Sequence, residues 1–159
     1  MTPTFRPISP EDQPFLLRLY ASTREDELAQ VEWKEGELEA FIEQQFEAQH
    51  QYYQQTFLGA AFDLILLDGK PAGRLYIHRR ADEIRLIDIA LLPEHRGAGL
   101  GGQLMKTILD EGQKVGKPVR IHVERFNPAL HLYQRLGFEN VEDQGVYYLM
   151  EWRPRMPAV

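Results

Sequence analysis

Cysteine is absent from this chain of 159 residues. Its absence excludes disulfide bonds, thiolate metal sites and a cysteine nucleophile, and with them several classes of enzyme. Long apolar runs are absent too, since no segment approaches the roughly 20 residues needed to span a bilayer. The first residues, Met-Thr-Pro-Thr-Phe-Arg, lack the charged and then apolar pattern of a signal peptide. We therefore expect a cytoplasmic protein with no membrane partner.

The sequence has fewer basic than acidic residues: 18 lysines and arginines against 24 aspartates and glutamates, which gives a net charge of −6. This balance argues against nucleic acid as a partner and favours a cationic substrate. The length and the hydrophobic fraction of 43% are typical of one globular domain with its own core. We expect this domain to cover residues 1–153, followed by a loose tail at residues 154–159.

The most informative stretch runs from Leu86 to Gly102. Apolar residues alternate up to Leu92 with the period of a β-strand, and Pro93 then ends the run. Four glycines follow within six residues, and a helical apolar pattern begins among them at Leu100. The first N–H groups of a helix have no internal partner, and glycines let a phosphate approach the backbone. With Arg96 adding a positive charge, this loop predicts a pyrophosphate site.

Two kinds of pyrophosphate loop match these glycines. The spacing G-x-G-x-x-G fits a dinucleotide turn, and Glu124 follows at a suitable distance. However, Pro93–Arg96 separates the strand from the first glycine, and the chain has only one such unit. The pattern Arg96-x-x-Gly99-x-Gly101 instead resembles the coenzyme A loop, Q/R-x-x-G-x-G/A, of the GNAT acyltransferase superfamily. This resemblance implies acetyl-CoA as cosubstrate, and our interpretation needs no metal.

In that family the strand before the loop offers backbone groups to the pantetheine arm, and the loop holds the diphosphate. Carried over to this sequence, the resemblance assigns strand and loop residues to the coenzyme. They are Ile89, Ala90, Leu91, Arg96, Gly97, Ala98, Gly99, Leu100, Gly101 and Gly102.

A second motif lies at the expected distance along the chain. The segment Asn127–Phe138 is similar to the N-x-x-A-x-x-L-Y-x-x-x-G-F segment of GNAT enzymes, although it is shorter by one residue before the tyrosine. The resemblance implies that Tyr133 reprotonates the departing thiolate and that Asn127 hydrogen-bonds the coenzyme. From the residues alone, Tyr133 also fits a core position and Asn127 also fits a helix cap.

The general base has more than one candidate. His122 alternates with Val119 and Val123 on a predicted strand, at a position where some family members place a carboxylate base. A histidine can accept an ammonium proton near neutral pH, although an exposed or sheet-bonded histidine fits the pattern equally well. Asp88, on the strand before the glycine loop, and Glu83 are its rivals.

The rest of the chain predicts the elements of an α/β fold. A strand at Thr4–Ile8 precedes a helix that begins at Ser9-Pro10, and a second helix covers Glu37–Gln55. Between the helices, Ala21–Gly36 reads as irregular. The turn Asp68-Gly69-Lys70 joins two β-rich runs, and the strand after the glycine-loop helix should pair in parallel. We expect a GNAT-type mixed, mostly antiparallel sheet flanked by helices on both faces.

These features together indicate an N-acetyltransferase that moves an acetyl group from acetyl-CoA to a primary amine by direct attack in a ternary complex. The acceptor is a small molecule or a peptide, and the sequence leaves a homodimer open. Two other functions remain open: a coenzyme-binding module without catalysis, and a dinucleotide-dependent oxidoreductase.

Overall fold

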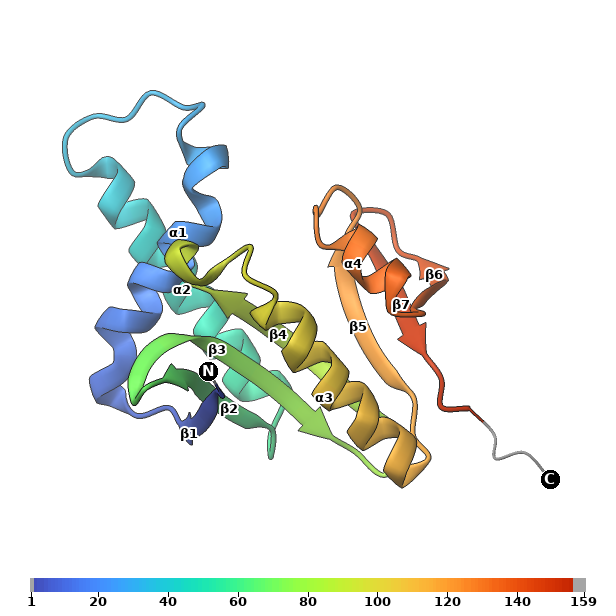
Figure 1. Ribbon diagram of the computed structural model, residues 1–159. Helices are drawn as coiled ribbons and strands as arrows, with labels where there is room; N and C mark the ends of the chain where they lie inside the picture. Colours follow the sequence, from blue (N-terminus) through green and yellow to red (C-terminus); the bar gives the residue numbers. More distant parts are fainter. Residues whose placement is uncertain (1, 156–159) are drawn as a thin grey trace. The chain divides into compact units, whose positions relative to one another are not determined.

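The computed structural model describes residues 2–155, and it shows an α/β fold with a seven-stranded sheet and four α-helices among these residues (Figure 1). The helices are α1 (Gln13–Leu28), α2 (Glu37–Thr56), α3 (Leu100–Val115) and α4 (Leu130–Arg135), with short 3₁₀ turns η1 (Pro10–Asp12) and η2 (Pro93–His95). The strands are β1 (Thr4–Pro7), β2 (Ala61–Leu67), β3 (Lys70–Arg79), β4 (Ile84–Leu91), β5 (Val119–Glu124), β6 (Glu139–Asp143) and β7 (Tyr147–Trp152). The predicted fold class is confirmed.

The sheet has the strand order β1-β2-β3-β4-β5-β7-β6. Its parallel pair is β4 with β5, as expected for two strands joined by a crossover helix. This pairing covers three residue pairs, from Ile84↔Val119 to Leu86↔Ile121, whereas β5 pairs with β7 along its whole length. The strand that leads into the glycine loop is therefore bound to β5 only at its beginning.

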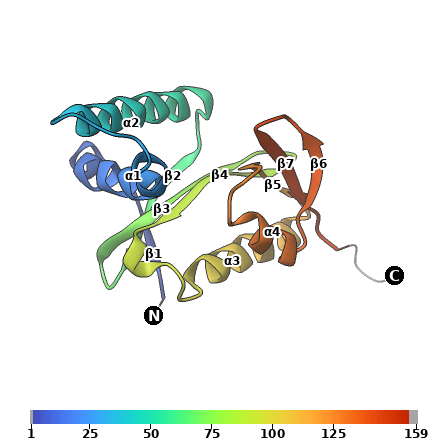
Figure 2. The same ribbon diagram turned by 90° about the horizontal axis from the view of Figure 1, so that it is seen from above.

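The chain divides into two compact units, and the long strands β3 and β4 contribute to both. Residues 2–76 and 89–96 form the first unit. Within it, α1 and α2 lie side by side in both views (Figures 1 and 2). The core of this unit joins the two helices to β2 through a cluster of buried side chains, in which Tyr20 meets Phe46 edge-on at 6.0 Å between ring centroids. The cluster is Leu16, Tyr20, Phe46 and Leu64.

The expectation that Ala21–Gly36 is irregular was wrong for its first half, because α1 continues to Leu28. This end of the helix is largely polar, so it gives no apolar periodicity to read. Ser22 Oγ donates to Leu19 O at 2.7 Å, and Thr23 Oγ1 donates to Tyr20 O at the same distance. These hydroxyls therefore bond to the preceding turn within the helix instead of competing with it.

The chain enters α1 through a fixed turn. Both Asp12 carboxylate oxygens accept from the Arg6 guanidinium at 2.9 Å, and Oδ2 also accepts from the Ser9 backbone N–H at 2.8 Å. The bonds to Arg6 outweigh burial and lower the pKa of Asp12 to about 2. The link from β1 to α1 is therefore held by a bidentate pair and a capping contact.

The second unit comprises residues 77–88 and 97–155. Its long helix α3 buries one face and ends at Val115, and the following Gly116 has a φ of 69°, the left-handed conformation of a helix C-cap. At the other end of the described chain, Gln113 on α3 exchanges two hydrogen bonds with the Arg155 backbone, of 2.8 and 2.9 Å. The rest of the predicted loose tail, residues 156–159, lies outside the described residues.

Candidate active site

The glycine loop has the backbone conformation that the sequence requires. Gly97 and Gly99 have φ angles of 78° and 83°, which side-chain-bearing residues rarely adopt, and Gly99 is the N-cap of α3. The first intrahelical bond at this end runs from Gln103 N to Gly99 O at 3.0 Å. The N–H groups of the three residues before Gln103 thus lack a carbonyl partner within the helix. They form the positive end of a 16-residue helix, where an anion is stabilised.

The space beside these glycines is open. A Cβ atom built on Gly97, Gly99, Gly101 or Gly102 would meet no heavy atom of another part of the described chain within 4 Å. By contrast, a Cβ on Gly112, in the last turn of α3, would lie 3.0 Å from the Trp152 ring. The loop glycines therefore do not serve close packing of the protein itself. A backbone that is left bare next to open space fits a diphosphate, which needs that approach.

A glycine in this loop can serve two purposes: it leaves space beside the backbone, or it permits a positive φ angle. Valine substitutions at two positions distinguish these purposes. Gly101→Val meets no protein atom and does not sit at a positive φ, so we expect the free energy of unfolding to change by less than about 1 kcal/mol. The new side chain would fill the space predicted to hold the diphosphate, so the rise in melting temperature caused by acetyl-CoA should disappear. Gly99→Val should lose the same rise and also stability, because its φ is 83°.

The control is Gln103→Val, which puts the same side chain on an exposed position of the same helix turn. It should keep the response to acetyl-CoA. An undiminished response in both glycine variants would place the diphosphate elsewhere.

Arg96 is positioned by the first unit. Its Nε donates to Leu91 O at 2.9 Å, and one Nη donates to the Ser22 hydroxyl of α1 at 3.1 Å. The guanidinium has five donors, so two bonds leave others for a phosphate. Sequence reasoning missed Ser22, because the contact joins residues 74 positions apart and follows no local pattern.

The strand residues assigned to the pantetheine arm are fixed by a close backbone approach. Ile89, Ala90 and Leu91 are half-buried at the end of β4. A Cβ on Gly73 of β3 would lie 2.2 Å from Ala90 O, a distance that real Cβ atoms do not reach. Gly73 therefore sets how near these two strands come. A glycine inside a strand pattern signals such an approach, and that signal was available in the sequence.

Gly73→Ala should move the backbone at Ala90 and Leu91. We expect a loss of about 1–3 kcal/mol in the free energy of unfolding, as for other overpacked sites. We also expect a higher KM for acetyl-CoA with a smaller change in kcat, if the displaced groups are those that the resemblance assigns to the coenzyme. Gly69→Ala, in the turn before β3, provides the comparison, because its φ of 75° should cost stability without moving Ala90, so its KM should stay unchanged. If Gly73→Ala lost stability but kept its KM, Gly73 would serve packing alone.

Tyr133 lies within electrostatic range of Asp88 in the second unit. Tyr133 lies on α4 with 6% of its surface exposed, and its ring meets Phe138 edge-on at 5.7 Å. Burial, and then the negative charge of Asp88, raise the pKa of Tyr133 to about 12. The phenol is therefore protonated throughout the neutral range and available as a proton donor. Tyr133 and Asp88 are 45 residues apart in the sequence. The structure brings the Asp88 carboxylate close enough to the phenol to affect its pKa.

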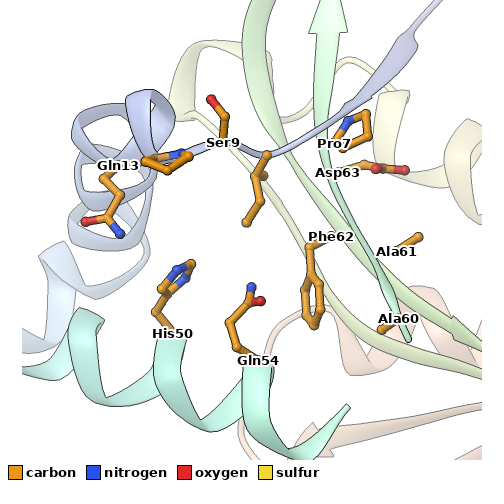
Figure 3. A pocket seen from close by; sticks show the side chains of 11 residues that line it. Pro7, Ser9, Gln13, His50, Gln54, Ala60, Ala61, Phe62 and Asp63 are labelled. Carbon is orange, nitrogen blue, oxygen red and sulfur yellow. The ribbon is translucent and has the colours of Figure 1, made fainter. Parts of the chain in front are cut away.

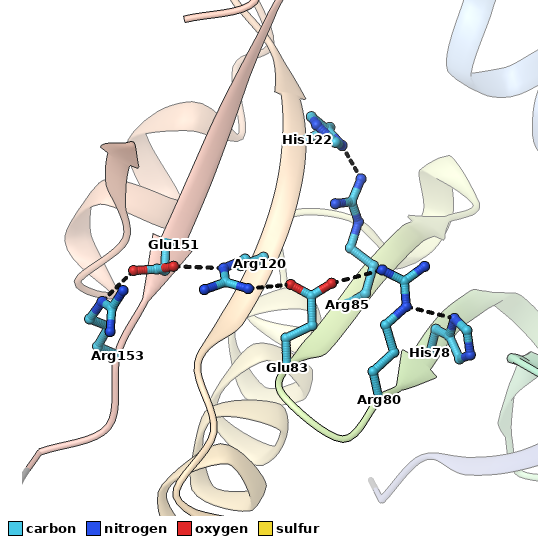
Figure 4. A network of polar contacts seen from close by, with 8 residues as sticks. All are labelled: His78, Arg80, Glu83, Arg85, Arg120, His122, Glu151 and Arg153. Atoms are coloured by element: carbon cyan, nitrogen blue, oxygen red, sulfur yellow. Dashed lines mark hydrogen bonds and ion pairs between the residues drawn. The ribbon is translucent and has the colours of Figure 1, made fainter. Parts of the chain in front are cut away.

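His122 has a partner that the sequence did not predict. Its side chain is exposed on β5, and its Nδ1 accepts a hydrogen bond from the Arg85 guanidinium of β4 (Figure 4). With Nδ1 engaged in this way, the proton of a neutral ring sits on Nε2, so no lone pair is left for a substrate proton.

Glu83, the third base candidate, belongs to an ion-pair network. Its carboxylate accepts from Arg120 at 2.6 Å and from Arg80 at 2.9 Å, and Arg120 also donates to Glu151 at 2.6 Å (Figure 4). Burial opposes the charge of Glu151, but the bonds from Arg120 and Arg153 prevail and lower its pKa. The network ties the start of β4 to β5 and β7, and it gives Glu83 a structural role.

The prediction that Asn127 caps the following helix was wrong, because the N-cap of α4 is Ala129. Asn127 Oδ1 accepts from Ala129 N at 2.9 Å in the turn before α4, which begins at Leu130. The exposed side chain keeps its amide NH₂ for a second partner. Residues 2–155 contain no group of three or more His, Cys, Asp or Glu side chains that could hold a metal ion.

Comparisons with known proteins identify the family and the fold of this chain. The model of the Acetyltransferase (GNAT) family matches residues 17–138, so the chain belongs to the GNAT acetyltransferase family. A curated relative, the [ribosomal protein bS18]-alanine N-acetyltransferase of Haemophilus influenzae, is 35% identical over 68 residues, which are 42% of this chain and 47% of the relative. The L-amino acid N-acyltransferase MnaT of Escherichia coli is 46% identical over 48 residues, 29% of this chain and 28% of the relative.

The matched segments therefore span about half and just over a quarter of these two relatives. Among solved structures, the PaiA N-acetyltransferase of Thermoplasma acidophilum in complex with coenzyme A has a TM-score of 0.70 at 21% identity, covering 96% of this chain and 99% of that chain. This likeness shows a shared fold. In residues 2–155 we find no helix with the length and apolar character that crossing a bilayer would need.

Proposed function

We propose that this protein transfers an acetyl or other acyl group from acyl-CoA to a primary amine. The observation that carries the proposal is the glycine loop, whose bare backbone and helix N–H groups border open space in the way a diphosphate requires. Arg96 adds a charge at the loop entrance. Family membership favours coenzyme A over a dinucleotide as the source of that diphosphate.

The acceptor is proposed to be the α-amine of an amino acid or of a peptide. Both curated relatives are named for acyl transfer to such groups, one on alanine of a ribosomal protein and one on L-amino acids. The net charge of −6 is compatible with a substrate that approaches as an ammonium ion.

The reaction is proposed to proceed by direct attack of the amine on the thioester. No cysteine exists in the sequence, and no serine lies in a nucleophile motif, so a covalent acyl-enzyme has no obvious carrier. The residues of β4 from Ile89 to Leu91 would align the pantetheine arm, and a strand N–H would stabilise the charge that develops on the thioester oxygen.

Two side chains are proposed to handle protons. Tyr133 donates its proton to the departing sulfur, and the burial that raises its pKa also raises the pKa of a thiol leaving beside it. Asp88 is proposed as the base that receives the ammonium proton. The Arg85 hydrogen bond moves this assignment away from His122, whose Nδ1 is already occupied.

The proposal is tested by measuring release of free coenzyme A from acetyl-CoA in the presence of L-amino acids and short peptides. Mass spectrometry of the acceptor should show one added acetyl group on its α-amine. Release that depends on the amine supports transfer. Binding of acetyl-CoA without release with any amine would favour a coenzyme-binding module, and binding of NAD without acetyl-CoA would favour an oxidoreductase.

A further inference from the structure

Three large apolar side chains of the second unit lie in water. Phe126, on the loop between β5 and α4, exposes 92% of its surface. Val146 and Tyr147, where the chain enters β7, expose 67% and 43%. We call these three residues the Phe126 patch. Exposed apolar side chains that gather at one place on a surface mark a contact site for another molecule.

Arg125 holds the two parts of this patch together. Its backbone N–H donates to Val146 O at 2.9 Å, and its Nε donates to Gly145 O at 3.1 Å. One Nη donates to both carboxylate oxygens of Asp143, at 2.7 and 2.8 Å. The loop that carries Phe126 is therefore bonded to the β6–β7 turn through both backbone and side chain. An anchor on a fixed backbone loses little conformational freedom when a partner binds.

The patch adjoins residues that are assigned to the chemistry. Asn127 follows Phe126 directly, and its Oδ1 accepts from Ala129 N at 2.9 Å. Ala129 O in turn accepts from Tyr133 N at 3.1 Å in the first turn of α4. One hydrogen-bonded turn thus connects Phe126 to the helix that carries the proposed proton donor. A side chain of an acceptor held near Tyr133 can therefore meet the patch.

A cavity of about 450 Å³ in the first unit is another place where a side chain could bind. It lies between the end of β1, the C-terminal half of α2 and the start of β2, and Figure 3 shows Gln54 pointing into the space that Phe62 borders. None of its lining residues belongs to the second unit, which holds Asp88, Asn127 and Tyr133. The Phe126 patch is therefore the better candidate for contact with an acceptor.

Negative charge surrounds the patch. β6 carries three exposed carboxylates, from Glu139, Glu142 and Asp143, and no basic residue. Glu124, at the end of β5, adds a fourth, and Arg125 balances one of them, Asp143. Such surroundings attract an ammonium group and repel a carboxylate. The first residue of a peptide has the ammonium without a carboxylate on the same carbon, whereas a free amino acid has both.

We propose that the Phe126 patch binds the apolar side chain of the first residue of a peptide acceptor, while the surrounding carboxylates attract its ammonium group. This inference rests on the proposed function, because it names the acceptor of the same transfer reaction. Phe126 is then a specificity-determining residue, which contacts the acceptor and not the coenzyme.

Three acceptors test the proposal: serinamide, L-leucinamide and L-leucine. The amides stand for the first residue of a peptide, because they have no carboxylate. Release of coenzyme A from acetyl-CoA gives kcat/KM for each. We expect leucinamide to exceed serinamide by at least about tenfold, because its side chain buries apolar surface. Leucine should fall below leucinamide, and the gap should narrow as salt rises, since screening weakens the repulsion of its carboxylate.

Variants locate the contact. In Phe126→Ser, kcat/KM for leucinamide should fall to within about threefold of that for serinamide, whereas the dissociation constant of acetyl-CoA should not change. Val146→Ser should reduce the preference as well, and it provides a second, independent variant of the patch. Phe5→Ser, at an exposed position on β1, is the matched control. It should keep the preference, as should Gln54→Ala in the cavity of the first unit.

Four results would overturn the inference and leave the proposed function intact. They are equal kcat/KM values for leucinamide and serinamide, a preference that survives in both patch variants, a preference lost in Gln54→Ala, and a gap between leucinamide and leucine that does not depend on salt. A dimer in sedimentation that Phe126→Ser dissociates would assign the patch to a second copy of the chain and overturn it too.

The absence of transfer to any of these amines would instead contradict the proposed function. Calorimetric titration of leucinamide and serinamide into the full chain saturated with coenzyme A then decides the inference without turnover. Tighter binding of leucinamide that Phe126→Ser removes would support it, and equal affinities would overturn it.

Discussion

Tyr133→Phe should lower kcat by roughly ten- to a thousandfold while the affinity for acetyl-CoA barely changes. The substitution keeps the ring that packs against Phe138 and removes only the hydroxyl. If that hydroxyl reprotonates the departing sulfur, the loss falls on the step in which the thioester breaks. Steady-state kinetics and calorimetric titration with acetyl-CoA measure the two quantities, and Tyr52→Phe, at an exposed position on α2, is the control.

The stability of the same variant provides an independent readout. In the unfolded chain a tyrosine ionises near pH 10, whereas in the folded protein the pKa of Tyr133 is about 12. The folded state therefore holds its proton longer, so stability is complete below pH 10 and is lost as the pH rises through 12, by about 2–3 kcal/mol. Tyr133→Phe should lack this component. A variant that lost stability and turnover in equal measure at neutral pH would indicate a packing role instead.

Asp88→Asn should lower kcat/KM for the amine by roughly a hundred- to ten-thousandfold, the usual range for loss of a general base. The amide keeps the shape of the side chain but cannot receive the ammonium proton. His122→Ala should change kcat/KM by less than about threefold, because His122 Nδ1 accepts from Arg85 in the native protein. Both variants should retain binding of acetyl-CoA.

The pH profiles of these two variants decide the assignment. With Asp88 as base, the acid limb of kcat/KM moves in Asp88→Asn and stays in place in His122→Ala. The reverse result would return the role to His122. If the limb moved in neither variant, an ordered water chain to solvent would be the better account of the proton transfer.

Local chemistry made the conformation of the glycine loop predictable from the sequence. Each of its features depends on residues within one or two turns of each other. These features are the positive φ angles of Gly97 and Gly99, the start of α3 at Leu100 and the C-cap of α3 at Gly116. The same reasoning failed where the sequence carries no periodicity. The C-terminal end of α1 is helical although it is polar, because its polar side chains find partners within the helix. The hydroxyls bond to backbone carbonyls, and Arg24 pairs with Glu27 at 3.2 Å.

Contacts between residues far apart in the sequence could not be predicted in this way. The bond from Arg96 to Ser22 and the bond from Arg85 to His122 join positions 74 and 37 residues apart, and no spacing in the sequence encodes them. The second of these contacts altered our assignment of the base. Gly73 is an intermediate case, because its place inside a strand hinted at a close approach, but only the structure identifies Ala90 as the neighbour.

The central claim is that the loop at the start of α3 holds the diphosphate of coenzyme A. Its most direct test is the melting temperature of the full chain with millimolar acetyl-CoA or millimolar NAD. Ligand at a hundred times its dissociation constant adds about 2.7 kcal/mol of stability, so acetyl-CoA should raise the melting temperature by about 5–10 °C. NAD should leave it unchanged. A rise with NAD and none with acetyl-CoA would contradict the account.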